Sequence, residues 1–168
     1  MTGAREEGEL IVFTGSGKGK TTAALGVALR TIGQGGKVIF IHFTGPQCPV
    51  PGEIKTATRI GSSLRMVGVR SEAGDISYLD DFSESVDSVT EALVKAHDVW
   101  VQECDLLVLD DIGHHLEQGS IDVAEVMALI DDRPPNVGIL LTGTSIPGPI
   151  VQRAELVTEF LLIKEPPR

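Results

Sequence analysis

A chain of 168 residues, 42% of them hydrophobic, is long enough for one domain with a sizeable core and too short for two ordinary domains. Its formal net charge of −10 argues against nucleic-acid binding, because neutralising phosphates requires clustered Lys and Arg. The apolar runs are far shorter than a membrane span, and the N-terminal stretch MTGAREEGEL lacks the apolar core of a signal peptide. We therefore expect residues 1–168 to form one cytoplasmic domain that binds neither nucleic acid nor membrane.

The first predicted element is a strand at Leu10 to Phe13, followed directly by the glycine-rich stretch TGSGKGKTT. A phosphate loop usually reads Gly, four variable residues, Gly, Lys, then Ser or Thr. Thr14 occupies the first position here, and the rest of the pattern is intact. The glycines let amide groups point at an anion, the lysine adds charge, and the threonine offers a hydroxyl to Mg²⁺. We expect the loop to bind nucleotide phosphates through Gly15, Ser16, Gly17, Lys18, Gly19, Lys20, Thr21 and Thr22.

The residues after the loop favour a helix, because Thr21 to Leu29 is rich in Ala and Leu with helical spacing. The loop would then lie at a helix N-terminus, where the dipole and unpaired amide groups attract negative charge. The alternative is a glycine-rich turn that binds nothing, and such a turn needs neither Lys20 nor Thr21.

The middle of the chain gives weaker signals. Lys37 to Phe43 predicts a second strand, and GPQCPVPGE predicts a loop. We then expect a short helix at Arg59 to Met66 and a short strand at Met66 to Val69. Two distant cysteines, Cys48 and Cys104, indicate neither a disulfide framework nor a zinc site.

The second half alternates helices and strands. Asp81 and Glu84 have capping-box spacing, and apolar residues recur at steps of three and four as far as Cys104, which predicts one long amphipathic helix. Further predictions are a buried strand over 105–111, a helix over 122–132, and strands over 136–143 and 155–163. This order predicts an α/β fold in which helices flank a mostly parallel sheet.

The strand LLVLDD ends in two carboxylates, Asp110 and Asp111. Two acids at the end of a buried strand are costly unless they meet a cation or water. Together with the loop upstream they indicate a nucleotide site, with Mg²⁺ held by Thr21, Asp110 and Asp111. The doublet His114 and His115 follows in what we interpret as a polar loop; a metal or proton-transfer role is the less favoured alternative. We interpret His42 and His97 as structural or solvated.

Four stretches in collinear order, FTGSGKGKTTAALGVALRTIGQGGKVIFIHF, DLLVLDDI, RPPNVGILLTG and AELVTEFLLIK, resemble the P-loop family of ATP:corrinoid adenosyltransferases, also called cob(I)alamin adenosyltransferases. The resemblance implies a P-loop NTPase of RecA-like architecture, homodimeric, with ATP as co-substrate, corrinoid as substrate and Mg²⁺ as cofactor. It also implies transfer of the 5′-deoxyadenosyl group of ATP to reduced cobalt, with release of triphosphate. No general base is needed, because the cobalt(I) is itself the nucleophile.

The resemblance also implies roles for particular residues. Lys20, Thr21 and Asp111 would be catalytic, and Arg30 would lie near the nucleoside, although a solvated helix-end cation is an equal alternative. Asp111 stands where the family usually has Glu. Tyr78 is the single aromatic in the segment expected to cover the corrinoid, and Thr144 replaces an expected Arg.

Three hypotheses follow. The first is an adenosyltransferase, whose partners would include a protein that delivers or reduces the corrinoid. The second is a nucleotide-binding sensor or chaperone module that transfers nothing. The third, a RecA-type ATPase, is disfavoured because the second acid of the strand is Asp rather than Glu.

Overall fold

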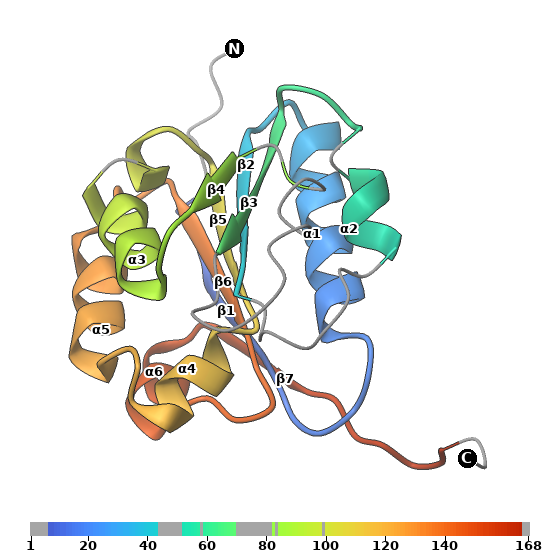
Figure 1. Cartoon of the computed structure of the whole chain (residues 1–168), viewed down its shortest axis with the longest axis vertical. Coiled ribbons are helices and arrows are strands. Elements are labelled where there is room, and N and C mark those ends of the chain that lie inside the picture. The colour runs from blue at the N-terminus through green and yellow to red at the C-terminus, as the bar shows by residue number, and fades with distance from the viewer. Residues whose placement is uncertain are drawn as a thin grey trace.

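The computed structural model describes residues 7–43, 52–57, 59–69, 82, 84–98 and 100–165. These residues form one sheet in the order β4-β3-β2-β5-β6-β1-β7, with every strand pair parallel (Figure 1). This confirms the predicted α/β fold. Its strands are β1 (Leu10–Thr14), β2 (Val38–His42), β3 (Leu64–Val69), β4 (Glu84–Val86), β5 (Leu106–Asp110), β6 (Gly138–Thr142) and β7 (Leu156–Glu159).

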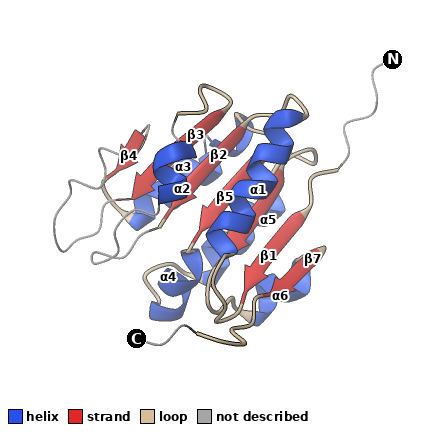
Figure 2. Cartoon of the chain, turned by 90° about the vertical axis from the view of Figure 1, so that its right-hand side faces the viewer, coloured by secondary structure: helices blue, strands red, loops and turns tan. Residues whose placement is uncertain are grey.

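Helices cover both faces of the sheet (Figures 1 and 2). On one face lie α1 (Lys20–Gly33) and α2 (Gly52–Ala57). On the other lie α3 (Val89–Asp98), α4 (Ile112–Gln118), α5 (Val123–Asp132) and α6 (Gly148–Arg153), with a 3-10 turn at Trp100–Gln102 after α3. No helix in the described ranges is long and apolar enough to cross a membrane.

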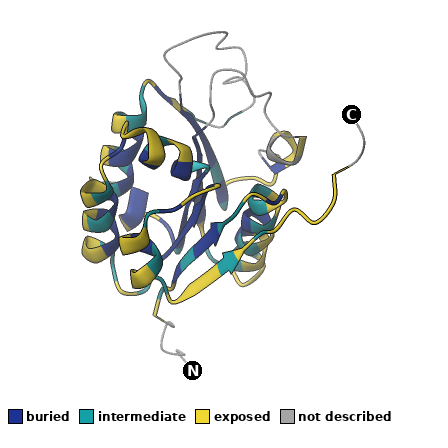
Figure 3. Cartoon of the chain, turned by 90° about the horizontal axis from the view of Figure 1, so that it is seen from below, coloured by how far each residue is buried: buried dark blue, intermediate teal, exposed yellow. Residues whose placement is uncertain are grey.

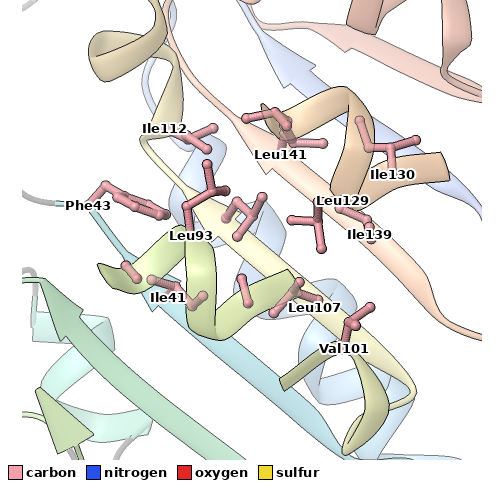
Figure 4. Packing of buried hydrophobic residues seen from close by; sticks show 14 of the residues in the cluster. Ile41, Phe43, Leu93, Val101, Leu107, Ile112, Leu129, Ile130, Ile139 and Leu141 are labelled. Atoms are coloured by element: carbon pink, nitrogen blue, oxygen red, sulfur yellow. The ribbon is translucent and has the colours of Figure 1, made fainter. Parts of the chain in front are cut away.

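Alternation along the central strands sorts their side chains into two apolar clusters. The larger one lies under α3, α4, α5 and α6, and its packing is shown in Figure 4. The smaller one lies under α1 and includes Val38 and Phe40 of β2. Since successive side chains of a strand point to opposite faces, the next position of β2 on the α1 face is His42. The same alternation brings Asp110 of β5 and Thr142 of β6 to that face, side by side at the carboxyl ends of three neighbouring strands.

The last strand differs from the others in its exposure. β7 pairs with β1 and is mostly exposed, whereas the central strands are buried (Figure 3). Its Leu156 and Val157 are both more than 40% exposed. The predicted strand over 155–163 is therefore too long, because the chain leaves the sheet after Glu159. Residues 160–165 continue without regular secondary structure.

The long helix predicted from Asp81 is wrong. Glu84–Val86 is a strand that pairs with β3, and the helix begins only at Val89. The cap is formed instead by Ser88, whose Oγ accepts from the Glu91 amide at 3.0 Å, while the Glu91 carboxylate accepts from the Asp87 amide at 2.9 Å. Asp81 itself lies outside the described residues.

The short helix predicted at Arg59 to Met66 is also wrong. The helix of this region, α2, lies earlier in the chain, and β3 already begins at Leu64. Gly61 explains the difference, because its φ of 101° is left-handed and ends any helical path before the strand. The strand predicted at Met66 to Val69 is confirmed. The helix α6 was not predicted, since the segment around Pro147 contains two prolines and gives no clear helical signal.

His97 connects α3 to α5 and provides a test of stability against pH. Its Nδ1 lies 2.7 Å from Asp98 Oδ1 and its Nε2 lies 3.1 Å from Asp132 Oδ2. Hydrogen bonds to Asp98 and then Asp132 raise the pKa of His97. A raised pKa means that the stabilisation is fully present below the ordinary value of about 6.5 and is lost as the pH rises through the folded-state value.

We expect His97→Gln to lower the free energy of unfolding at acidic pH by less than about 1 kcal/mol, because the side chain is partly exposed and its ion pairs are screened. The difference from the wild type should disappear at alkaline pH. Urea unfolding of both proteins across a pH series measures it, and a difference independent of pH would contradict the assignment.

Candidate active site

The glycine-rich loop connects β1 to α1, as predicted. Gly15 and Gly19 have φ values of 98° and 101°, a left-handed conformation that other residues adopt only with strain. The Lys20 ammonium donates to the carbonyl oxygens of Gly15 and Gly17, each at 2.7 Å. Burial lowers the pKa of Lys20, and the negative charges of Asp111 and Asp110 oppose this effect. The loop thus wraps around one cation at the N-terminus of a helix.

Asp110 is the buried acid of the site, with no exposed surface. Its Oδ1 accepts from the Thr142 hydroxyl at 2.7 Å, and the Thr21 hydroxyl lies 3.0 Å from both carboxylate oxygens. His42 Nδ1 lies 2.6 Å from Oδ2. A fully buried carboxylate requires such donors, because leaving water without them is costly. The structure therefore places the first residue of the acid pair directly beneath the start of α1.

Asp111 occupies a different environment. It follows β5 with a φ of 64°, left-handed and alone in that respect among the described non-glycine residues. Its amide donates to the Thr142 hydroxyl oxygen at 2.8 Å. Burial, and then the charge of Asp110, raises the pKa of the Asp111 carboxyl. The two acids thus have distinct roles: Asp110 is enclosed by donors, whereas Asp111 is a half-buried carboxylate near Lys20.

These residues fit Mg²⁺ in part. A hydroxyl and a carboxylate beside a phosphate loop are the oxygen ligands that Mg²⁺ takes when nucleotide phosphates and water complete its shell. The described residues contain no group of three or more His, Cys, Asp or Glu side chains able to hold a metal by themselves. The chemistry of the donors therefore suits an ion that arrives with a nucleotide.

The chain after β7 contacts the phosphate loop. Sequence patterns did not predict this contact. The Gly17 amide donates to the Phe160 carbonyl at 2.7 Å, and the Phe160 amide donates to the Thr14 carbonyl at 2.8 Å. The Phe160 ring meets that of Phe13 edge to face, with centroids 5.5 Å apart. Lys18 pairs with Glu165 at 3.7 Å between two largely exposed side chains. We call residues 160–165 the C-terminal strap.

The strap gives two loop glycines a further reason to be glycine. A Cβ at Gly15 would lie 2.4 Å from the Phe160 carbonyl oxygen, and a Cβ at Gly17 would lie 2.7 Å from the Phe160 carbonyl carbon. Both distances are too short for any side chain. The loop pattern therefore reflects close packing on the strap as well as room for an anion.

The remaining predicted site residues are not all brought together. Ser16 and Lys18 are exposed on the loop, and Thr22 lies in the first turn of α1. Arg30 is exposed in the last turn of α1, about 15 Å along the helix axis from Lys20. Tyr78 lies outside the described residues.

Two site residues were missed by the sequence analysis. Thr142 and His42 both contact Asp110, and each is a polar residue that closes an apolar strand run, the signal that had identified Asp110. The predicted loop at the histidine doublet is wrong, because His114 and His115 lie on α4. Burial, and then His114, lowers the pKa of His115, whose Nδ1 is 3.2 Å from Ser120 Oγ.

Comparison with known proteins places this arrangement in a family. Residues 6–168 match the family model described as ATP:corrinoid adenosyltransferase BtuR/CobO/CobP. The corrinoid adenosyltransferase of Escherichia coli is 29% identical over 167 residues, covering 95% of this chain and 79% of that protein. That of Pseudomonas aeruginosa is 28% identical over 167 residues, with 95% and 77% covered. Corrinoid adenosyltransferase CobA of Salmonella typhimurium is 28% identical over 169 residues, with 95% and 79% covered.

The family model spans nearly the whole chain, and it includes the phosphate loop, the buried acid and the strap. The resemblance seen in the sequence is thereby confirmed. This chain belongs to the BtuR/CobO/CobP family of ATP:corrinoid adenosyltransferases.

Proposed function

We propose that this chain transfers the 5′-deoxyadenosyl group of ATP to the reduced cobalt of a corrinoid and releases triphosphate. The observation that carries the proposal is the phosphate loop closed around Lys20, with Thr21 hydrogen-bonded to the buried Asp110. Membership of the family supplies the reaction class, a transferase acting on ATP and a corrinoid.

In the proposed reaction the cobalt(I) electron pair forms a bond to the ribose 5′ carbon. The bond from that carbon to the phosphate oxygen breaks, and its electrons leave with the triphosphate. Negative charge therefore develops where the N-terminus of α1 and the Lys20 ammonium lie. Gly19 caps α1 without a side-chain hydrogen bond, so no side chain of the cap competes with phosphate for the helix amide groups. The reaction requires no general base, because no proton is removed from either substrate. The site accordingly offers the Lys20 ammonium and backbone amide groups to the triphosphate.

Mg²⁺, when bound with the nucleotide, would neutralise further charge on the triphosphate. We propose that Thr21, Asp110 and Asp111 hold the ion or its water ligands. The Thr21 hydroxyl donates a hydrogen bond to Asp110, which leaves the lone pairs of its oxygen available to a cation. Asp111 is supported by its half-buried position beside Asp110 and near Lys20.

Substitution of Asp111 tests this metal role. Asp111→Asn should weaken ATP binding in the presence of Mg²⁺ more than in its absence, because only a carboxylate strongly attracts the ion or its waters. Asp111→Glu should retain the Mg²⁺ effect, since it keeps the charge. Calorimetric titration of ATP, with Mg²⁺ or with a chelator, measures both. Equal losses with and without the ion would show that Asp111 is only a strand-end acid.

The proposed enzyme is a cytoplasmic homodimer whose chain, residues 1–168, is one domain. The single sheet that joins the described residues supports the domain assignment. We also propose that Arg30 lies near the nucleoside and that Tyr78 covers the corrinoid. We further propose that a partner protein delivers the corrinoid to this chain or reduces it.

One experiment decides between transfer and simple binding. Anaerobic incubation with ATP, Mg²⁺ and reduced cobalamin, followed through the corrinoid absorption spectrum, should show conversion to the adenosylated form. Calorimetry on the same preparation should show ATP binding. Binding of ATP without any spectral conversion would instead favour a non-catalytic nucleotide-binding module.

A further inference from the structure

His42 is a buried polar residue that the reaction outlined above does not use. It closes β2, is 4% exposed, and is paired in register with Asp110 on the neighbouring strand. Its Nδ1 lies 2.6 Å from Asp110 Oδ2, the shortest of the contacts to that carboxylate. Because the carboxylate only accepts, the hydrogen atom of this contact belongs to the imidazole, which donates.

The donors around Asp110 come from three separate elements. Thr21 belongs to α1, Thr142 to β6 and His42 to β2. Among the described residues, Oδ1 has a 2.7 Å contact to Thr142, whereas Oδ2 has its short contact to His42. Without His42, the contact that the described residues leave to Oδ2 is the 3.0 Å contact to the Thr21 hydroxyl, which Oδ1 shares. The plane of the carboxylate is therefore fixed from one side by Thr142 and from the other by His42.

The second ring nitrogen of His42 shows that packing alone does not account for a histidine at this position. His42 Nε2 is buried and has no hydrogen-bond partner within the described part of the chain. The ring stacks on Phe82, with centroids 6.1 Å apart and planes at 21°. A buried polar atom without a partner costs about 1 to 3 kcal/mol, so an apolar ring would fill this place at lower cost if packing were its only role. The imidazole is thus explained by its contact with Asp110.

We infer that His42 is a positioning residue of the nucleotide site: by holding Asp110 it directs the Thr21 hydroxyl toward Mg²⁺ and the phosphates. The inference rests on the proposed Mg-ATP site and deepens it. The hydrogen bond that the Thr21 hydroxyl donates to Asp110 turns its lone pairs toward the phosphate loop, and His42 holds the Asp110 carboxylate in the orientation that accepts this bond. Groups that orient metal ligands in this way typically change metal affinity when they are replaced.

The test compares His42→Phe with His42→Asn. The Phe ring keeps the volume and the stack on Phe82 and removes the donor, whereas the Asn amide can place an N–H near the position of Nδ1. We expect His42→Phe to lower ATP affinity in Mg²⁺ by about 10- to 100-fold, with little change in a chelator. His42→Asn should recover most of the Mg²⁺ effect. Calorimetric titration of ATP provides the readout.

Two results would overturn the inference: an unchanged Mg²⁺ effect in His42→Phe, or an equal loss in both variants. If His42→Phe does not fold, judged by circular dichroism, His42→Gln takes its place, because its longer amide reaches the Nε2 position. The inference then requires that Mg²⁺ raise the ATP affinity of His42→Asn more than that of His42→Gln. An equal rise in the two variants would overturn it.

The same titrations separate this inference from the proposed function. They measure Mg²⁺-dependent binding of ATP and involve no corrinoid. If the wild type forms no adenosylated corrinoid but His42→Phe loses the Mg²⁺ effect, the proposed reaction fails and the role of His42 stands. If transfer occurs and the Mg²⁺ effect is untouched, the reaction stands and the role of His42 fails.

Discussion

Lys20→Ala is expected to lower Mg-ATP affinity by at least about 30-fold, the effect of removing one partner from a partly buried, hydrogen-bonded charge pair. Lys20 Nζ lies against the loop carbonyls of Gly15 and Gly17, where phosphate oxygens would also approach. Removing the ammonium leaves the triphosphate charge opposed by Mg²⁺, amide groups and the helix dipole, without the protein's nearest side-chain cation. Calorimetric titration of Mg-ATP measures the loss.

Two controls make the result specific. Lys95→Ala removes the same side chain from the surface of α3, where it pairs with Glu91, and should leave ATP affinity unchanged. Lys20→Gln keeps a donor for one loop carbonyl and removes the charge. It should be nearly as impaired as Lys20→Ala if charge is what matters. Unchanged affinity in Lys20→Ala, with an unchanged circular dichroism spectrum, would refute the site.

Local patterns were sufficient for the loop and for the buried acid. The glycines, Lys20 and Thr21 lie within one short stretch between an apolar strand and an Ala-rich helix, so their meeting requires no knowledge of the fold. Asp110 stood out because it closes an entirely apolar run. The analogy to phosphate-loop proteins predicted that Thr21 and Asp110 share a Mg²⁺ ion, and the structure places the Thr21 hydroxyl 3.0 Å from both carboxylate oxygens of Asp110.

His42 closes an apolar run as Asp110 does, but its contact with Asp110 could not be predicted from that local pattern. Its role depends on which strand lies next to β2 and on the register that pairs it with Asp110, 68 residues away. Neither is encoded in the residues around His42. The contact between the loop and the C-terminal strap also depends on strand pairing, because Gly17 meets Phe160 only when β7 pairs with β1.

The misplaced helix start shows how two local signals compete. Asp81 with Glu84 and Ser88 with Glu91 have identical capping spacing, and apolar residues at steps of three follow both pairs. Pairing of Glu84–Val86 with β3 decides between them, since residues committed to a parallel strand cannot also begin a helix. A tertiary contact thus overrode a helical pattern that was locally acceptable.

Gly17→Ala is expected to impair both stability and ATP binding, because the loop and the strap cannot both keep their places around a new methyl group. Its Cβ would lie 2.7 Å from the Phe160 carbonyl carbon and 2.8 Å from the Phe160 oxygen. Overpacking of this kind typically costs about 1 to 3 kcal/mol. Gly26→Ala is the matched control, since among the described residues nothing beyond its chain neighbours and the backbone of its own helix lies within 4 Å of its Cβ position. A helix interior gains about 0.5 to 1 kcal/mol from that change.

The same substitution in a chain without the C-terminal strap tests whether the strap causes the loss of stability and of ATP binding. In a chain that ends at Glu159, provided that its melting curve shows a folded protein, the three atoms nearest to the Gly17 Cβ position, all from Phe160 and Leu161, are gone. Gly17→Ala should then change neither the melting temperature nor the ATP affinity, so the two changes are strongly non-additive. If Gly17→Ala costs as much in the shortened chain as in the full chain, the glycine serves the loop conformation alone. The close approach of Phe160 would then have no part in shaping the phosphate site.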